Sequence, residues 1–419
     1  MNPDGASAAI EAVVRDETPR IIAALIRIAR SFDLAEDALQ EATTAAVVHW
    51  RRSGVPRNPG AWITAVAHRK LIDQSRRAKT HLDNVEALSR ELVQTAEPDD
   101  PDAAGNDPDE SLYPDDRLRL IFTCCHPALS TEARIALTLR TLGRLKTPEI
   151  ARAFLIPEST LAQRIVRAKN KILEARIPYE VPSRDRLPER LDAVLAVIYL
   201  IFNEGYAATA GEELVRTDLA SDAIRLGRTL TELLPDEPDV RGLLALMLLH
   251  DARRRSRINR LGELVPLEDQ DRSCWDHLQI AEGLEQLDTA MRAQRPGPYQ
   301  LQAAIAALHA RAERAADTDW TEIAALYGQL VRLAPTPVVA LNHAVAIAMA
   351  HGLEEGLARI DRLGSEALDA YPLYHAARAD LLRRLGRNGE AREAYSRARD
   401  LTSNPVEQAY IRRRIAALG

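Results

Sequence analysis

A short stretch of the chain, residues 158–172, carries hydroxyl, amide and cationic side chains at positions that would share one face of a helix. Four apolar residues recur there at intervals of 4, 3 and 4 residues, which puts them on the opposite, inward face. Guanidinium groups bind guanine edges or phosphates, and hydroxyl and amide groups bind bases or position a helix on DNA. The polar face therefore predicts nucleic-acid recognition. Its members are Ser159, Thr160, Gln163, Arg164, Arg167 and Lys171.

The residues before this face predict a helix-turn-helix. A helix is expected over residues 130–142, Thr147 and Pro148 start a short helix that ends near Phe154, and residues 155–157 form a tight turn. A short helix, a turn and a longer helix form the arrangement that places a recognition helix in the major groove. The alternative is an ordinary helical hairpin with a solvated basic face. A net charge of +8 over residues 117–178 argues against that alternative.

The first 77 residues predict a three-helix bundle with a basic edge. Helices are expected from Thr18, from Asp33 to Trp50 and from Asn58 onward, each opened by a residue type that caps helices. Asp33 and Glu36 form a pattern typical of a capping box. Between the last two helices lies a basic loop, residues 51–58, which glycine and proline keep out of helix. The pattern alone leaves open a plain bundle with solvated charges.

The net charge of −6 is an average over four different segments. Residues 1–77 carry +2, residues 78–116 carry −10, residues 117–178 carry +8 and residues 179–419 carry −6. Prolines, like charges and few apolar residues over 78–116 predict a flexible acidic linker between two domains. A cationic segment beside an acidic linker favours nucleic-acid binding by one part of the chain only.

Composition predicts an all-α protein. Hydrophobic residues make up 46%, charged residues 28% and aromatic residues only 4% of 419 residues, and no alternating β-branched runs occur. A β-sandwich, a barrel and a Rossmann fold are therefore excluded. Three cysteines cannot form a disulfide framework, and we find neither a signal peptide nor an apolar run long enough for a membrane span. We expect a cytoplasmic protein with no membrane partner.

The C-terminal part, residues 185–419, predicts pairs of helices stacked into an α-solenoid. Residues 373–406 fit a tetratricopeptide unit, with a turn at Gly386 and small or aromatic residues at the packing positions. Gly352 precedes Gly386 by 34 residues, which is the period of that repeat. Such a stack builds a concave face that binds a partner. A regulatory protein is the partner expected at these repeats.

Acidic and histidine residues in the same part raise the alternative of a metal or hydrolase site. Their spacing does not fit a His-Glu-x-x-His motif, and Cys124-Cys125-His126 is too tight for a closed zinc site. We therefore expect no metal, no cofactor and no catalytic residue, and ion pairs with nearby arginines instead. The acidic and histidine residues are Glu204, His250, Asp251, Glu268, Asp269, Asp271, Asp276 and His277. The arginines are Arg253, Arg254, Arg255 and Arg272.

Motifs over the first 178 residues, taken in order, resemble the extracytoplasmic-function class of bacterial RNA polymerase sigma factors, in the sigma-70 family. Residues 35–41 (AEDALQE) resemble the region-two motif that docks on the polymerase clamp helices, and residues 59–63 (PGAWI) resemble the segment for −10 promoter recognition. Residues 147–171 resemble the region-four reader of the −35 element. The chain departs from this pattern at Ala162, where the family often has a basic residue.

The resemblance assigns roles to the basic and acidic side chains. The docking face for core RNA polymerase would comprise Asp33, Glu36, Asp37, Gln40 and Glu41. Contacts to the −10 element would come from Arg51, Arg52, Arg57, Asn58, Arg69, Arg76 and Arg77, and the polar face of residues 158–172 would contact the −35 element. The basic loop could hold an unstacked base, with arginines following the phosphates. Trp50 and Trp62 could stack on bases but at helical spacing are more often core residues.

Three further stretches, 199–206, 249–253 and 267–276, resemble the extension of one subgroup of these sigma factors, which carries a C-terminal tetratricopeptide-like domain. The leading hypothesis is thus a sigma factor that binds core RNA polymerase and recognises and opens promoter DNA, with regulation by the C-terminal repeats. The second hypothesis is a tetratricopeptide-regulated helix-turn-helix protein that does not bind polymerase. The third is an enzyme in the C-terminal half.

Overall fold

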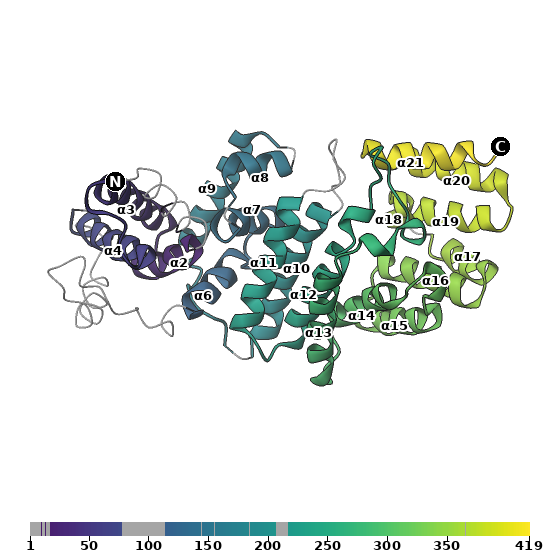
Figure 1. Cartoon of the computed structure of the whole chain (residues 1–419), viewed down its shortest axis with the longest axis horizontal. Helices are drawn as coiled ribbons and strands as arrows, with labels where there is room; N and C mark the ends of the chain where they lie inside the picture. The colour runs from purple at the N-terminus through teal and green to yellow at the C-terminus, as the bar shows by residue number, and fades with distance from the viewer. Residues whose placement is uncertain are drawn as a thin grey trace. The chain divides into compact units, whose positions relative to one another are not determined.

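The computed structural model of this chain is helical throughout the residues that it describes (Figure 1). Those residues are Ile10, Val13, 17–77, 114–143, 145–154, 156–183, 185–206, 217–364 and 366–419. In this part of the chain no strand forms, and one isolated antiparallel bridge joins Ile258 to Leu264. The all-α prediction is confirmed. The same described residues contain no helix that is both long and apolar enough to cross a bilayer. The predicted linker lies outside them, except that residues 114–116 begin a helix.

The chain divides into two compact units, with the boundary between Val197 and Ile198. The first unit contains both of the small domains that the sequence predicts, the three-helix bundle and the helix-turn-helix. The second unit contains the helical pairs. The boundary falls inside one helix, α10 (Leu187–Tyr206).

The N-terminal bundle contains α2 (Thr18–Ala29), α3 (Phe32–Ser53) and α4 (Pro59–Arg77). Along its buried side, α3 has alanines at intervals of three and four residues, whose small side chains let α2 and α4 approach closely. Trp50 follows these alanines on the same buried side of α3 and is 1% exposed. Its ring contacts the ring of Trp62 of α4, which is 9% exposed. The expectation that both tryptophans are core residues is confirmed.

The start of α3 differs from the prediction. Its N-cap is Ser31, whose hydroxyl oxygen accepts a hydrogen bond from the backbone N–H of Leu34 at 3.4 Å. Phe32, the first helical residue, is 5% exposed, so the helix begins early enough to bury this ring. The capping-box prediction for Asp33 and Glu36 is therefore wrong, and both carboxylates contact another helix.

The helix-turn-helix is formed by α8 (Thr147–Ala153) and α9 (Glu158–Glu174), and α7 (Thr131–Thr141) packs against both. Before them comes α6 (Pro114–Cys124), which packs against α2 and α7. The four apolar positions of α9 predicted to face inward are all buried, which confirms the spacing argument. They are Leu161, Ile165, Ala168 and Ile172.

The second unit is a succession of helices that pack against their neighbours along the chain. They are α11 (Thr217–Leu233), α12 (Pro238–Asp251), α13 (His277–Arg292), α14 (Pro298–Arg311), α15 (Trp320–Leu333), α16 (Pro337–His351), α17 (Leu353–Arg362), α18 (Glu366–Asp369), α19 (Pro372–Arg384), α20 (Asn388–Leu401) and α21 (Pro405–Ala416). The predicted repeat unit corresponds to α19 and α20, whose turn contains Gly386 at φ 75°. Tyr395 and Ala398 of that unit are buried as expected.

Candidate functional site

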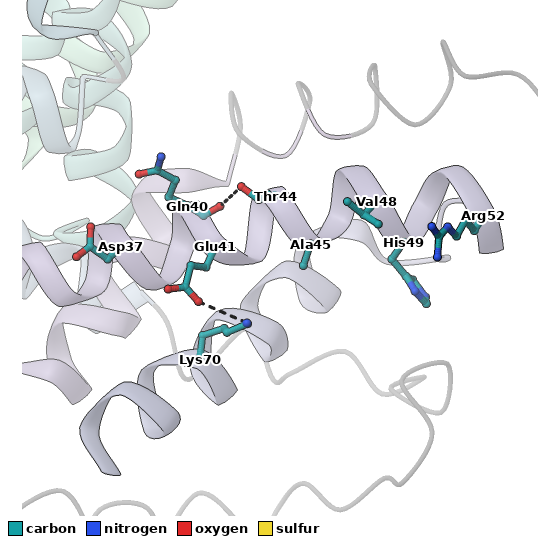
Figure 2. A pocket seen from close by; sticks show the side chains of 9 residues that line it. All are labelled: Asp37, Gln40, Glu41, Thr44, Ala45, Val48, His49, Arg52 and Lys70. Atoms are coloured by element: carbon teal, nitrogen blue, oxygen red, sulfur yellow. Dashed lines mark hydrogen bonds and ion pairs between the residues drawn. The ribbon is translucent and has the colours of Figure 1, made fainter. Parts of the chain in front are cut away.

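One side of α3 lines a shallow groove together with Lys70 of α4 (Figure 2). The groove residues recur at intervals of three and four along α3, so they share one side of the helix. This side differs from the one on which the buried alanines lie. Three of the five residues predicted to bind polymerase line the groove, namely Asp37, Gln40 and Glu41. The other residues are Thr44, Ala45, Val48, His49 and Arg52.

Charge is separated along α3. Acidic side chains occupy its first turns, where they interact favourably with the positive end of the helix dipole, and Arg51 and Arg52 occupy its last turn. Between these ends Lys70 Nζ lies 3.4 Å from Glu41 Oε2, and both side chains are about half exposed. A pair this exposed contributes about 0–1 kcal/mol to stability.

The basic end of α3 continues into the loop that precedes α4. Arg51, Arg52 and Arg57 are exposed, as a DNA-contacting role requires. Asn58 has a structural task, because its side-chain oxygen accepts a hydrogen bond from the backbone N–H of Ala61 at 3.0 Å and so caps α4. The geometry thus gives Asn58 a positioning role and leaves its amide NH₂ for a further contact.

Trp62 does not offer an open stacking surface. The ring of His49 is stacked on it, with centroids 5.4 Å apart and planes at 15°. The ring of Trp50 contacts it edge-on at 5.5 Å. A base could stack only on the outer side of His49, which is exposed.

Further along α4, Arg69 is exposed. Its neighbour His68 is half-buried, and burial together with the charges of Arg27 and Arg69 lowers the pKa of His68. The imidazole is therefore neutral at pH 7 and adds no charge to the basic surface. The side chains of Arg76 and Arg77 lie outside the described residues, although the helix itself continues through both.

A second groove lies in the helix-turn-helix, between the polar face of α9 and the start of α7. Five of the six predicted −35 residues line it, and Ser159 is the exception, exposed beside it. Ser130 caps α7 by accepting a hydrogen bond from the backbone N–H of Ala133 at 3.3 Å. On the same rim, hydrogen bonds from its own backbone N–H and from Ser130, with the charge of Arg164, lower the pKa of Glu132. The carboxylate of Glu132 is thus ionised next to Arg164 and can orient this guanidinium.

The remaining two acidic residues of the predicted docking face are engaged within the protein. Lys169 of α9 donates hydrogen bonds to Asp33 Oδ1 at 2.9 Å and to Glu36 Oε1 at 3.0 Å. Sequence reasoning did not identify Lys169, because it lies outside the polar face that suggested DNA binding. The available signal was its position next to Ala168 on the inward side of α9, where an unpaired ammonium group would be costly.

The acidic and histidine cluster of the second unit is dispersed among structural contacts. Asp251 pairs with Arg254 at 3.5 Å, Asp276 caps α13, and Glu268 pairs with Arg384 at 2.7 Å. Arg253 hydrogen-bonds His250, so the predicted pairing with carboxylates holds for Arg254 and is not seen for Arg253. Among the described residues no group of three or more potential ligands is arranged to hold a metal ion.

Comparison with protein families matches three segments of the chain. Residues 13–81 match Sigma-70 region 2, residues 119–172 match Sigma-70, region 4, and residues 190–291 match a family of unknown function, DUF6596. A protein of Rhizobium meliloti (strain 1021), described as uncharacterized protein R00370, is 48% identical over 394 residues, which cover 94% of this chain and 92% of that protein. No solved structure matches the chain.

Proposed function

Since the chain belongs to the sigma-70 family, we propose that it binds core RNA polymerase through α3 and helps to open promoters whose −10 and −35 elements it contacts. A role in promoter recognition follows from the presence of both sigma regions. The finer assignments, to polymerase contacts and to individual bases or phosphates, are our proposal. The observation that carries it is the separation of charge on α3, with acidic side chains at one end and arginines at the other.

The acidic groove suits a protein partner with basic groups. Asp37 and Gln40 are exposed and lie one helical turn apart, and the exposed carboxylate of Glu41 pairs with Lys70 on the same surface. Complementary charges of this kind fix orientation and accelerate encounter. Apolar contact would come from Val48, which is 53% exposed in the same groove.

The promoter contacts would come from two separate cationic surfaces. In region 2, Arg51, Arg52 and Arg57 lie close together at the end of α3 and in the loop that follows. In region 4, Arg167 and its neighbours project from the outer face of α9, whose inner face is fixed by apolar packing. A helix held in this way presents side chains to base edges in the major groove, while its cations bind phosphates.

A binding assay with core RNA polymerase tests the docking assignment. The double change Asp37→Lys and Glu41→Lys places two cations in the groove, and we expect affinity for core to fall by a factor of about ten or more. The matched control is Glu174→Lys, an exposed acidic residue at the end of α9, which should leave affinity unchanged. Equal binding by the wild type and the double variant would refute the docking assignment.

A helix-turn-helix regulator that does not bind polymerase is the second candidate. It is favoured by one observation, that Asp33 and Glu36 already bind Lys169. Run-off transcription with purified core and promoter libraries separates the two functions. Transcripts that start at selected promoters only when the chain is added support the sigma factor, and promoter binding without any transcript supports the regulator.

We also propose that the second unit regulates the first. Its support is architectural, since stacked helix pairs commonly form a binding surface for a partner. Removal of this unit is best made after Val197, because residues of α10 up to that point belong to the first unit. Transcription that becomes independent of the inducing condition indicates an inhibitory unit, and lost transcription indicates a required one.

A further inference from the structure

The middle of helix α2 is buried on all sides. Six consecutive residues, Ile21 to Ile26, are each no more than 5% exposed. A helix on the surface of a bundle buries only one stripe, so a continuous buried run requires neighbours on both sides. These neighbours are α3 and α4 of region 2, and α6, whose C-terminal turns belong to region 4. The two sigma regions thus share α2 as a common packing element.

Polar contacts fix this arrangement beside α2. Asp116 of α6 is buried, and its carboxylate accepts hydrogen bonds from Arg27 at 2.9 Å and from Arg119 at 2.7 Å. The hydroxyl of Tyr179 lies 2.8 Å from the backbone oxygen of Ala23 in α2 and 3.1 Å from that of Asp116. A buried carboxylate with two guanidinium partners specifies a geometry, since loss of either partner leaves charge without compensation.

A third contact lies at the docking face itself. The side chain of Lys169 is 9% exposed and bridges the carboxylates of Asp33 and Glu36 in the first turns of α3. The polar face of α9 points elsewhere, because Thr160, Arg167 and Lys171 remain exposed. This contact therefore engages one oxygen of each carboxylate, with Asp33 still 67% exposed, and it leaves the proposed −35 surface open.

We propose that this contact is autoinhibitory: region 4 holds region 2 through Lys169 and must release Asp33 and Glu36 before core polymerase can bind them. The inference rests on the proposed function, because it assigns these carboxylates to polymerase. It also predicts that core binding and −35 binding respond differently to the contact, which the proposed function alone does not predict. The closed arrangement lowers affinity for core and does not change binding of a −35 duplex by α9.

The test uses the full chain with Lys169→Met, which keeps the aliphatic stem and removes the charge. We expect affinity for core to rise about fivefold, as expected for the loss of a partly buried ion pair that competes with binding. Affinity for a −35 duplex should stay unchanged. The matched control is Lys146→Met, an exposed lysine just before α8 that belongs to neither proposed surface, which should not strengthen core binding.

A second variant and a chemical probe keep the test independent of local effects. Tyr179→Phe removes the hydroxyl that contacts α2 and should also strengthen core binding, although this residue lies outside both proposed surfaces. A carbodiimide, which joins an amine to a carboxylate in contact, should link Lys169 to Asp33 or Glu36 in the free chain and should fail to do so once core is bound.

The outcomes separate the two proposals. Equal core affinity of the wild type and both variants, with the cross-link retained in the polymerase complex, overturns the autoinhibition and leaves the sigma-factor function standing. Absence of core binding by the wild type and by both variants overturns the function and the inference together. Tighter binding by both variants, with loss of the cross-link in the complex, supports the inference.

Discussion

The first and second units treat their charged side chains differently. In the second unit, arginines pair with nearby carboxylates, as Arg387 does with Glu390 at 2.7 Å and Arg228 with Glu282 at 2.8 Å. In the first unit, the described residues show no ion pair for Arg52 or Arg167, and both are exposed. The difference teaches that similar arginine content serves two purposes. Paired arginines are part of the surface of the fold, whereas exposed ones on an ordered helix with no ion pair are accessible to an external anion.

The largest expected effect comes from Arg164 and Arg167 on the polar face of α9. Arg164→Ala with Arg167→Ala should weaken promoter binding about a hundredfold and reduce the salt slope by about two, because each cation binds a base or a phosphate in the proposed function. The measurement is binding of promoter DNA by the polymerase complex at several salt concentrations. The matched control removes two arginines that are paired in the second unit, Arg378→Ala and Arg387→Ala. If both pairs of changes weaken binding equally, the comparison between the units is wrong.

A smaller effect is expected where the first unit does bury a charge. Asp116→Asn removes the carboxylate that two arginines hold, and the free energy of unfolding of the first unit should fall by about 2 kcal/mol. Urea denaturation measures this change. Glu390→Gln, which disrupts an exposed pair, should change stability by no more than about 0.5 kcal/mol. A loss of stability at Asp116 no larger than that at Glu390 would contradict the structural role of the buried carboxylate.

The smallest expected effect is on how the stability of the second unit depends on pH. Burial, with the charges of Arg253 and Arg272, lowers the pKa of His309 to about 4, and burial also lowers the pKa of His250. Both histidines are neutral in the folded state, so stability is complete above about pH 6.5 and is lost as the pH falls toward 4. For His309 this amounts to about 1–2 kcal/mol between pH 7.5 and pH 5.

Urea midpoints of the wild type and of His309→Gln, measured across that pH range, test the assignment. The variant should depend on pH less steeply than the wild type. A slope that the substitution leaves unchanged would show that His309 is not the titrating group.

Local pattern was sufficient to predict much of the first unit. The spacing of Leu161 and its partners identified the buried side of α9, and that in turn identified the exposed polar side. Helical spacing also identified Trp50 and Trp62 as core residues. These features depend on residues within a few turns of one another, and hydrophobic periodicity reports such relations directly.

The contacts between the sigma regions were not predictable in the same way. Lys169 and Asp33 are 136 residues apart, and Arg27 and Asp116 are 89 apart, so no spacing rule relates them. The start of α3 was predicted at Asp33, although Ser31, two residues earlier, is also of a type that caps helices. Burial of Phe32 decided between them, and burial depends on tertiary packing.

The continuity of α3 has a consequence for how its two ends work together. At about 1.5 Å per residue, Asp37 and Arg52 are separated by about 22 Å along one uninterrupted rod. In the proposed function, a polymerase contact at the Asp37 end would therefore set the distance and the rotational phase of the DNA contact at the Arg52 end. One inserted residue would turn the far end by about 100° and misalign it, whereas about seven residues, close to two full turns, would lengthen the rod and keep its phase. The two proposed contacts therefore tolerate changes in the length of α3 only in steps close to whole helical turns.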